Sequence, residues 1–144
     1  MTSLATWKHR ATLYVEGGST AEATVDATPR KIAAFTTKGP EVGVTSSTTT
    51  DNVTVAEAGD YFVSANVSFS GTLSSTYNVT VYIDTTSTNL TLERKLGTGG
   101  DVGSAGLSGL VTCAAGEAIS LYQSTADGSA MTVTDAQLTV IRMS

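Results

Sequence analysis

The chain has 144 residues and a net charge of −5, and only 15% of its residues are charged. This length predicts a single domain, and the acidic balance excludes a chain that as a whole holds a nucleic-acid backbone. The only cysteine, Cys113, excludes a disulfide framework and a thiolate metal cluster, and it fits a reducing cytoplasm. No signal peptide and no stretch approaching the ~20 apolar residues of a membrane span is found, so we expect a soluble protein that is not exported.

The composition favours β-structure over helix. Ser and Thr together make up roughly 30% of the residues, well above average usage. Val and Thr suit a pleated sheet, and the 14 Gly suit tight turns. Helix-forming runs of Leu, Lys and Glu are absent from the sequence. We therefore expect an all-β domain.

Residues 1–28 differ from the rest of the chain, and we expect them to form an extended N-terminal arm ahead of a domain at 29–144. Residues 1–38 hold five of the eight Lys and Arg against three acids, which indicates docking onto an acidic surface. Within the arm, Trp7, Lys8, His9 and Arg10 combine an aromatic anchor with hydrogen-bond donors. Two interpretations remain open, a hook that binds a partner and a Trp folded back over the end of the domain.

Turn signals divide the remaining chain into short segments of alternating polarity. Lys38-Gly39-Pro40 is an expected turn, 97–106 is an expected glycine-rich loop, and Asp127-Gly128 is a strong turn signal. A regular series of this kind predicts an antiparallel β-sandwich or jelly roll. The expected strands are 11–15, 32–36, 42–45, 53–55, 61–71, 77–83, 90–96, 107–113, 119–123, 131–134 and 137–143.

The stretch 53–71 has the clearest pattern in the chain. A short alternating strand reaches Gly59, where glycine permits a bend, and a longer strand follows, so we expect a hairpin. Side chains of a strand alternate between its two faces, which places every second residue of 61–69 on one apolar face. Those residues are Tyr61, Val63, Ala65, Val67 and Phe69, and the other face is mostly polar.

The sequence shows no catalytic, metal or cofactor site. A Ser-His-acid triad would have to use His9 in the expected arm, far from a rigid scaffold. Cys113 lies in an apolar strand, where a free thiol is usually inert. The aspartates lie mostly at turns without the spacing of a calcium loop, and no helix follows the glycine-rich loop to complete a phosphate cradle. We expect no enzymatic activity and no cofactor.

Three motifs resemble the trimeric jelly-roll superfamily of tumour necrosis factor (TNF) and the complement globular heads. Val53-x-Val55 followed by Gly59-Asp60-Tyr61-Phe62-Val63 is similar to the superfamily's join of two strands. LVTCAAGEAISLYQ at 110–123 looks like its strand, Gly-acid turn, strand passage, and QLTVIRM at 137–143 like its closing central strand. The resemblance covers roughly residues 30–143.

The resemblance implies a TNF-like antiparallel jelly roll that assembles as a homotrimer around a three-fold axis. Unlike the secreted members, this sequence has no signal peptide, no collagen repeat and no cysteine pair, which argues against a signalling ligand. Similar cysteine-poor, Ser/Thr/Gly-rich jelly rolls occur in tailed phages. The chain looks most like a head decoration (cement) protein, a virion protein made in the bacterial cytoplasm that binds the major capsid protein on the outer surface of the shell.

The alternative is a trimeric receptor- or carbohydrate-binding tip of a tail fibre, and an enzyme such as a polysaccharide depolymerase ranks behind both. Tyr77, Tyr82 and Tyr122 could stack on sugar, but strand tyrosines are more often buried. We therefore expect a common set of residues to lie in the trimer interface or the core. They are Tyr61, Val63, Phe69, Tyr77, Tyr82, Tyr122, Leu138 and Val140.

Overall fold

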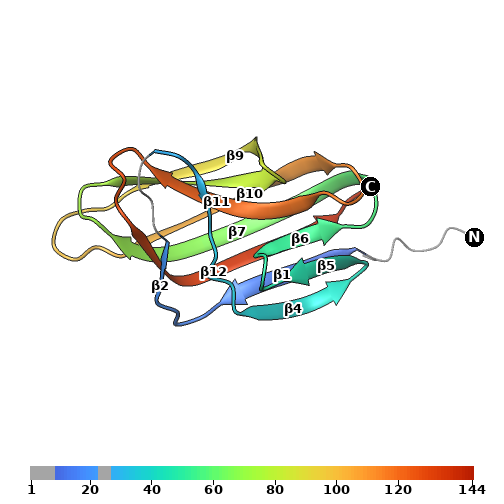
Figure 1. Ribbon diagram of the computed structural model, residues 1–144, viewed down its shortest axis with the longest axis horizontal. Coiled ribbons are helices and arrows are strands. Elements are labelled where there is room, and N and C mark those ends of the chain that lie inside the picture. Colours follow the sequence, from blue (N-terminus) through green and yellow to red (C-terminus); the bar gives the residue numbers. More distant parts are fainter. Residues whose placement is uncertain (1–8, 23–26) are drawn as a thin grey trace, which may run out of the picture.

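The computed structural model describes residues 9–22 and 27–144, which form two antiparallel β-sheets packed face to face (Figure 1). No helix occurs in these two ranges, and hence none that could span a membrane. The strands are β1 Arg10–Val15, β2 Thr20–Glu22, β3 Arg30–Lys31, β4 Thr37–Val42, β5 Val44–Ser47, β6 Asn52–Val55, β7 Gly59–Gly71, β8 Thr76–Ile83, β9 Thr86–Lys95, β10 Gly103–Cys113, β11 Ala118–Thr125 and β12 Met131–Arg142.

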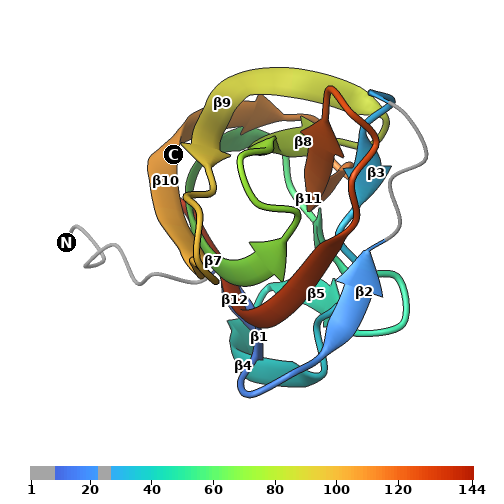
Figure 2. The ribbon, with the colours of Figure 1, turned by 90° about the vertical axis from the view of Figure 1, so that its left-hand side faces the viewer.

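The strand order confirms the predicted all-β antiparallel jelly roll. Sheet A has the order β10-β7-β12-β1-β4, with β2 also paired to β12. Sheet B has the order β5-β6-β11-β8-β9, with β3 also paired to β11. Viewed from its end, the sandwich closes almost into a barrel (Figure 2).

The core lies between the two sheets and comes from the alternating residues of the long strands. All five residues predicted for the apolar face of 61–69 are buried, and Tyr61, Val63 and Phe69 have no exposed surface. Leu138 and Val140 of β12 lie beside them and are equally buried. Each such side chain stabilises the fold by about 1.5–3 kcal/mol relative to an exposed one.

The predicted hairpin at 53–71 is wrong in one respect. β6 belongs to sheet B and β7 to sheet A, so the chain crosses from one sheet to the other between them. Gly59 begins β7 with φ +156°, and a Cβ there would lie 3.0 Å from the Arg142 Nε atom. Close approach to the end of β12, as well as the bend, requires glycine at this position.

Two further predictions need correction. The expected strand 32–36 is an irregular crossover, in which Ile32 N–H donates to sheet B at Leu121 O and Thr36 N–H donates to sheet A at Tyr14 O. The expected turn at Lys38-Gly39-Pro40 is the middle of β4, an edge strand. Proline is tolerated at an edge because its missing N–H leaves no ladder bond unmade.

The extent of the expected arm is also corrected. β1 pairs with β12 and with β4, so residues 10–15 lie inside sheet A rather than ahead of the domain. The reason is their alternation, which buries Ala11, Leu13 and Val15 in the core. Residues 1–8 and 23–26 of the expected arm lie outside the described residues.

Gln123 is a buried polar residue whose amide is left without a hydrogen bond in the described part of the chain. It is 1% exposed, and neither atom of its amide has a hydrogen-bond partner among the described residues. A buried amide without a partner costs about 1–3 kcal/mol.

Gln123→Met, a change of similar volume, should therefore raise the free energy of unfolding by about 1–3 kcal/mol in urea titrations. Asn89→Met, at an exposed position of β9, should change it little. A loss of stability in Gln123→Met would mean that buried water bonds the amide.

Candidate functional site

The outer face of sheet A carries a row of five opposed residues, one from each strand of the order β10-β7-β12-β1-β4, that is apolar at every position except Arg10. In the strand register Leu110 lies opposite Phe62, Phe62 opposite Ile141, Ile141 opposite Arg10, and Arg10 opposite Val42. Leu110 is 60% and Val42 is 42% exposed, while Phe62 and Ile141 are half-buried. Opposed residues of neighbouring strands have contacting side chains. We call Leu110, Phe62, Ile141 and Val42 the apolar row.

Two neutral polar rows follow on the same face. The first is Ser108, Ser64, Thr139 and Thr12, and the second is Gly106, Asn66, Gln137 and Tyr14. Within them the two threonine hydroxyls lie 3.1 Å apart, and the Asn66 amide donates to Gln137 Oε1 at 3.3 Å. Arg10 is the only charged side chain in these three rows. Beyond these rows the same face carries Asp60, opposite Thr112, and Asp135, opposite Ser68. On sheet B the charged residues opposite outward-facing ones are Lys31, Glu93 and Lys95.

Two shallow hollows interrupt this face on either side of Asn66. Their volumes are about 340 and 380 Å³. The second is hollow because Gly106 has no side chain between Ser104 and Ser108. Small-molecule sites are usually enclosed and mostly apolar, whereas these hollows are lined largely by polar groups. Side chains of another protein chain suit such hollows better than a small ligand.

A second apolar patch lies along the side of the sandwich where β9 and β10 meet (Figure 2). Leu90, Leu92 and Leu107 pack against the core but remain partly exposed. Gly109 faces Leu90 so closely that any Cβ there would overlap the leucine side chain. We call Leu90, Leu92 and Leu107 the β9–β10 seam. Core side chains thus reach the surface at this side.

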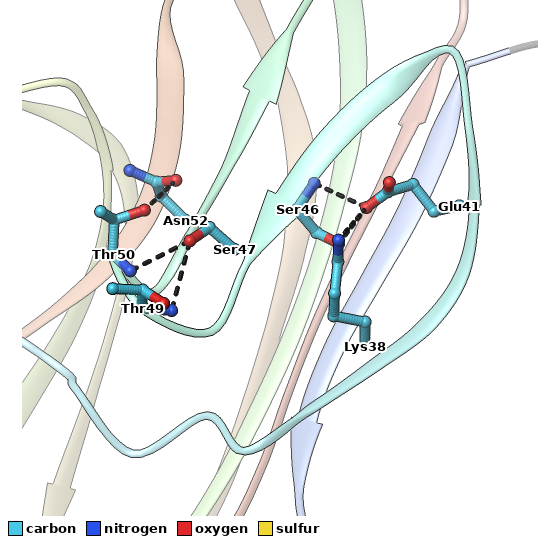
Figure 3. Close-up of polar contacts among 7 residues, drawn as sticks. All are labelled: Lys38, Glu41, Ser46, Ser47, Thr49, Thr50 and Asn52. Carbon is cyan, nitrogen blue, oxygen red and sulfur yellow. Dashed lines mark hydrogen bonds and ion pairs between the residues drawn. The ribbon is translucent and has the colours of Figure 1, made fainter.

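On the opposite side of the sandwich, the edge strands β4 and β5 are braced by polar contacts (Figure 3). The Glu41 carboxylate of β4 accepts hydrogen bonds from the backbone N–H and the hydroxyl of Ser46 in β5, and Lys38 Nζ lies 3.5 Å from it. The Ser46 hydroxyl, followed by its N–H, lowers the pKa of Glu41. In the next turn Ser47 Oγ accepts from two backbone N–H groups. Charge and proline protect this edge from pairing.

The predicted arm cluster is only partly described, since Trp7 and Lys8 lie outside the described residues. His9 Nε2 lies 3.4 Å from the Glu57 carboxylate, which also pairs with Arg142 at 2.9 Å. The His9 carbonyl accepts a hydrogen bond from Arg142 N–H, so the residue before β1 contacts the last residue of β12, near the C-terminus (Figure 1). Arg10 lies between Ile141 and Val42 of the apolar row.

The structure separates the eight residues predicted for the trimer interface or core into two groups. Tyr61, Val63, Phe69, Tyr77, Leu138 and Val140 have no exposed surface within one chain, so they are core residues. Tyr82 and Tyr122 lie on the outer face of sheet B and stack on each other, with ring centroids 3.9 Å apart. The apolar row was missed, because its four members come from four separate strands.

Among the described residues no group of three or more His, Cys, Asp or Glu side chains could hold a metal ion.

Cys113 is 2% exposed, and burial, followed by the charges of Glu117 and Asp84, raises its pKa to about 11. The thiolate is the reactive form of cysteine. We therefore expect Cys113 to resist iodoacetamide at pH 8 in the native protein and to react once urea unfolds it, as mass spectrometry would show. Fast native labelling would mean that β10 opens.

Searches for related proteins found similarity of fold alone. No protein-family model matches the chain, and no curated protein matches it. Among solved structures, the chain is similar to the Eiger TNF of S. frugiperda, with a TM-score of 0.73, 12% identity, and coverage of 94% of this chain and 92% of that one. It is also similar to murine APRIL, with a TM-score of 0.63, 14% identity, and coverage of 93% and 99%. These likenesses confirm the TNF-like jelly-roll fold.

Proposed function

We propose that the chain is a structural protein that assembles into a homotrimer through the outer face of sheet A. A ring of three identical subunits needs two different patches on each subunit, because every contact joins one patch to the other patch of the neighbour. The outer face of sheet A and the β9–β10 seam supply two such patches. Arg10 is the only charged side chain in the apolar row and the two polar rows of the first patch, so copies can meet along these rows with little like-charge repulsion.

The assembled trimer would serve as a decoration protein on the outer surface of a phage head, after synthesis in the bacterial cytoplasm. Two observations support this proposal, the TNF-like fold and the two surface patches through which copies can meet. A decoration protein needs a rigid body and complementary surfaces. Binding the assembled shell and not its dissociated subunits stabilises the shell by mass action, and three linked contacts act together.

The alternative function is a receptor- or carbohydrate-binding tip of a tail fibre. One observation favours it, the stacked Tyr82–Tyr122 pair on the outer face of sheet B, with Lys31 opposite Tyr122 in the register. Aromatic rings beside polar groups suit recognition of a sugar. On the sheet surface the pair also stabilises the fold as a cross-strand contact.

Copy number separates the two functions. The particle would be purified from its source, and this chain quantified against the major capsid protein by mass spectrometry. About one trimer for each three-fold position of the shell is the result that we expect for a decoration protein. A handful of copies per particle would favour the tail-fibre tip, and absence from the particle would overturn both.

A further inference from the structure

Two buried carboxylates hold the crossover 32–36 between the sheets. The Glu22 carboxylate, at the end of β2, accepts a hydrogen bond from Ala33 N–H at 2.9 Å. The Asp51 carboxylate, in the turn between β5 and β6, accepts one from Phe35 N–H at 3.1 Å. Both acids are only 6% exposed. We call Glu22 and Asp51 the carboxylate pair.

The carboxylate pair joins parts of the chain that no strand ladder connects. The crossover leaves sheet B after Ile32 and reaches sheet A at Thr36, and its N–H groups at residues 33 and 35 bond to these side chains instead of a strand. β2, β3 and β5 lie along the same side of the sandwich (Figure 2). Because Ala34 and Phe35 are buried, opening this segment would expose the core.

The charges around the pair determine how it responds to pH. Burial is the largest effect on both acids and raises the pKa of each above its ordinary value. The hydrogen bonds from Ala33 N–H and Phe35 N–H lower the pKa of Glu22 and of Asp51, respectively, without reversing either shift. The charge of Asp51 raises the pKa of Glu22, and Lys31, whose Nζ donates to Thr50 O at 3.3 Å, lowers that of Asp51. Among the described residues, these are the charged groups that act on the pair.

We propose that Glu22 and Asp51 form an acid-responsive latch, which holds the crossover more tightly when the two carboxyl groups are protonated than when they are ionised. A neutral carboxyl keeps a carbonyl oxygen that can accept the same backbone N–H, but it avoids the cost of a buried charge. When the pKa of an acid is higher in the folded than in the unfolded state, protonation adds its full stabilisation to the fold at pH values below the unfolded-state pKa. That stabilisation is lost as pH rises through the folded-state pKa. This inference concerns each chain's own fold and is independent of the proposed function.

Hydrogen exchange followed by NMR tests the latch. We expect the protection factors of the Ala33 and Phe35 amides, corrected for intrinsic exchange, to rise as pH falls from 7 to 4, where the unfolded carboxyls also begin to bind protons. The total increase should approach tenfold for each unit by which the folded-state pKa is raised. The central β12 amide of Val140 reports global unfolding and should change less.

Variants that keep the acceptor but remove the charge complete the test. The double variant Glu22→Gln with Asp51→Asn should abolish the difference between the two pH values at Ala33 and Phe35. Asn is suited to residue 51, where φ is +51°. Glu93→Gln, at an exposed carboxylate of β9, is the matched control and should keep the difference. A pH-independent wild type, an unchanged difference in the double variant, or an equal change at Val140 would each overturn the latch.

Discussion

Gly71→Ala is expected to destabilise the fold by about 3 kcal/mol or more, since it combines overpacking with the loss of buried hydrogen bonds. A Cβ on Gly71 would overlap the Tyr77 hydroxyl and lie 2.6 Å from its Cζ atom. The tyrosine cannot move aside cheaply, because it has no exposed surface and its ring packs edge-on against Phe69 at 5.1 Å between centroids. Its hydroxyl also accepts from Thr72 N–H and donates to Ala130 O, each at 2.9 Å.

Urea unfolding, monitored by far-UV circular dichroism, would measure this loss of stability. Ser70→Ala, at the neighbouring position with its side chain on the other face of β7, is the matched control and should cost less than about 0.5 kcal/mol. Tyr77→Phe should lie between them, because it loses both hydrogen bonds without a clash. If Gly71→Ala were as stable as Ser70→Ala, the Tyr77 ring would have to move aside at little cost, and the close packing around it would be contradicted.

Regular alternation made most of the sandwich predictable from sequence. β7, β8, β11 and most of β12 have one apolar face and one polar face, and such a pattern fits only a half-buried strand. The predicted break at 135–136 is a bulge, where the register of β12 shifts between Val133 and Asp135 without ending the strand. A bulge interrupts alternation in the same way as a turn, so the sequence does not distinguish them.

The crossover and β4 were unpredictable for a different reason. The crossover has the apolar composition of a strand, but its N–H groups bond to Glu22 and Asp51, which are distant in the sequence. β4 contains Gly39 and Pro40, a local turn signal that its position at the edge of the sheet overrides. In both segments the tertiary environment, and not local preference, decides the structure.

The candidate surface depends on strand order and register, which local patterns do not provide. In β7 alone Phe62 is one large apolar residue on a polar face, and an isolated exposed apolar residue is ordinary. Only the pairing of β10, β7, β12, β1 and β4 aligns it with Leu110 and Ile141. The sequence did identify Tyr82 and Tyr122, but their stack lies on the other sheet. The two faces thus compete as trimer interfaces.

A pair of matched variants decides between these faces. Phe62→Asp should dissociate the trimer, because each contact would lose about 1.5–3 kcal/mol of apolar burial and gain a desolvated charge. The dissociation constant should then rise by about a hundredfold or more. Tyr82→Asp places the same charge at an aromatic, half-buried and outward-facing position of sheet B, and it should leave the trimer intact.

Analytical ultracentrifugation over a range of concentrations would measure both variants, with circular dichroism to establish that each is folded. Because Phe62 points out of the sandwich, its replacement removes no residue from the buried core, and the monomer should remain folded. Dissociation by Tyr82→Asp alone would place the interface on sheet B and remove the stacked tyrosines from any sugar site. A monomeric wild type would contradict the homotrimer itself and leave the outer face of sheet A for a different protein.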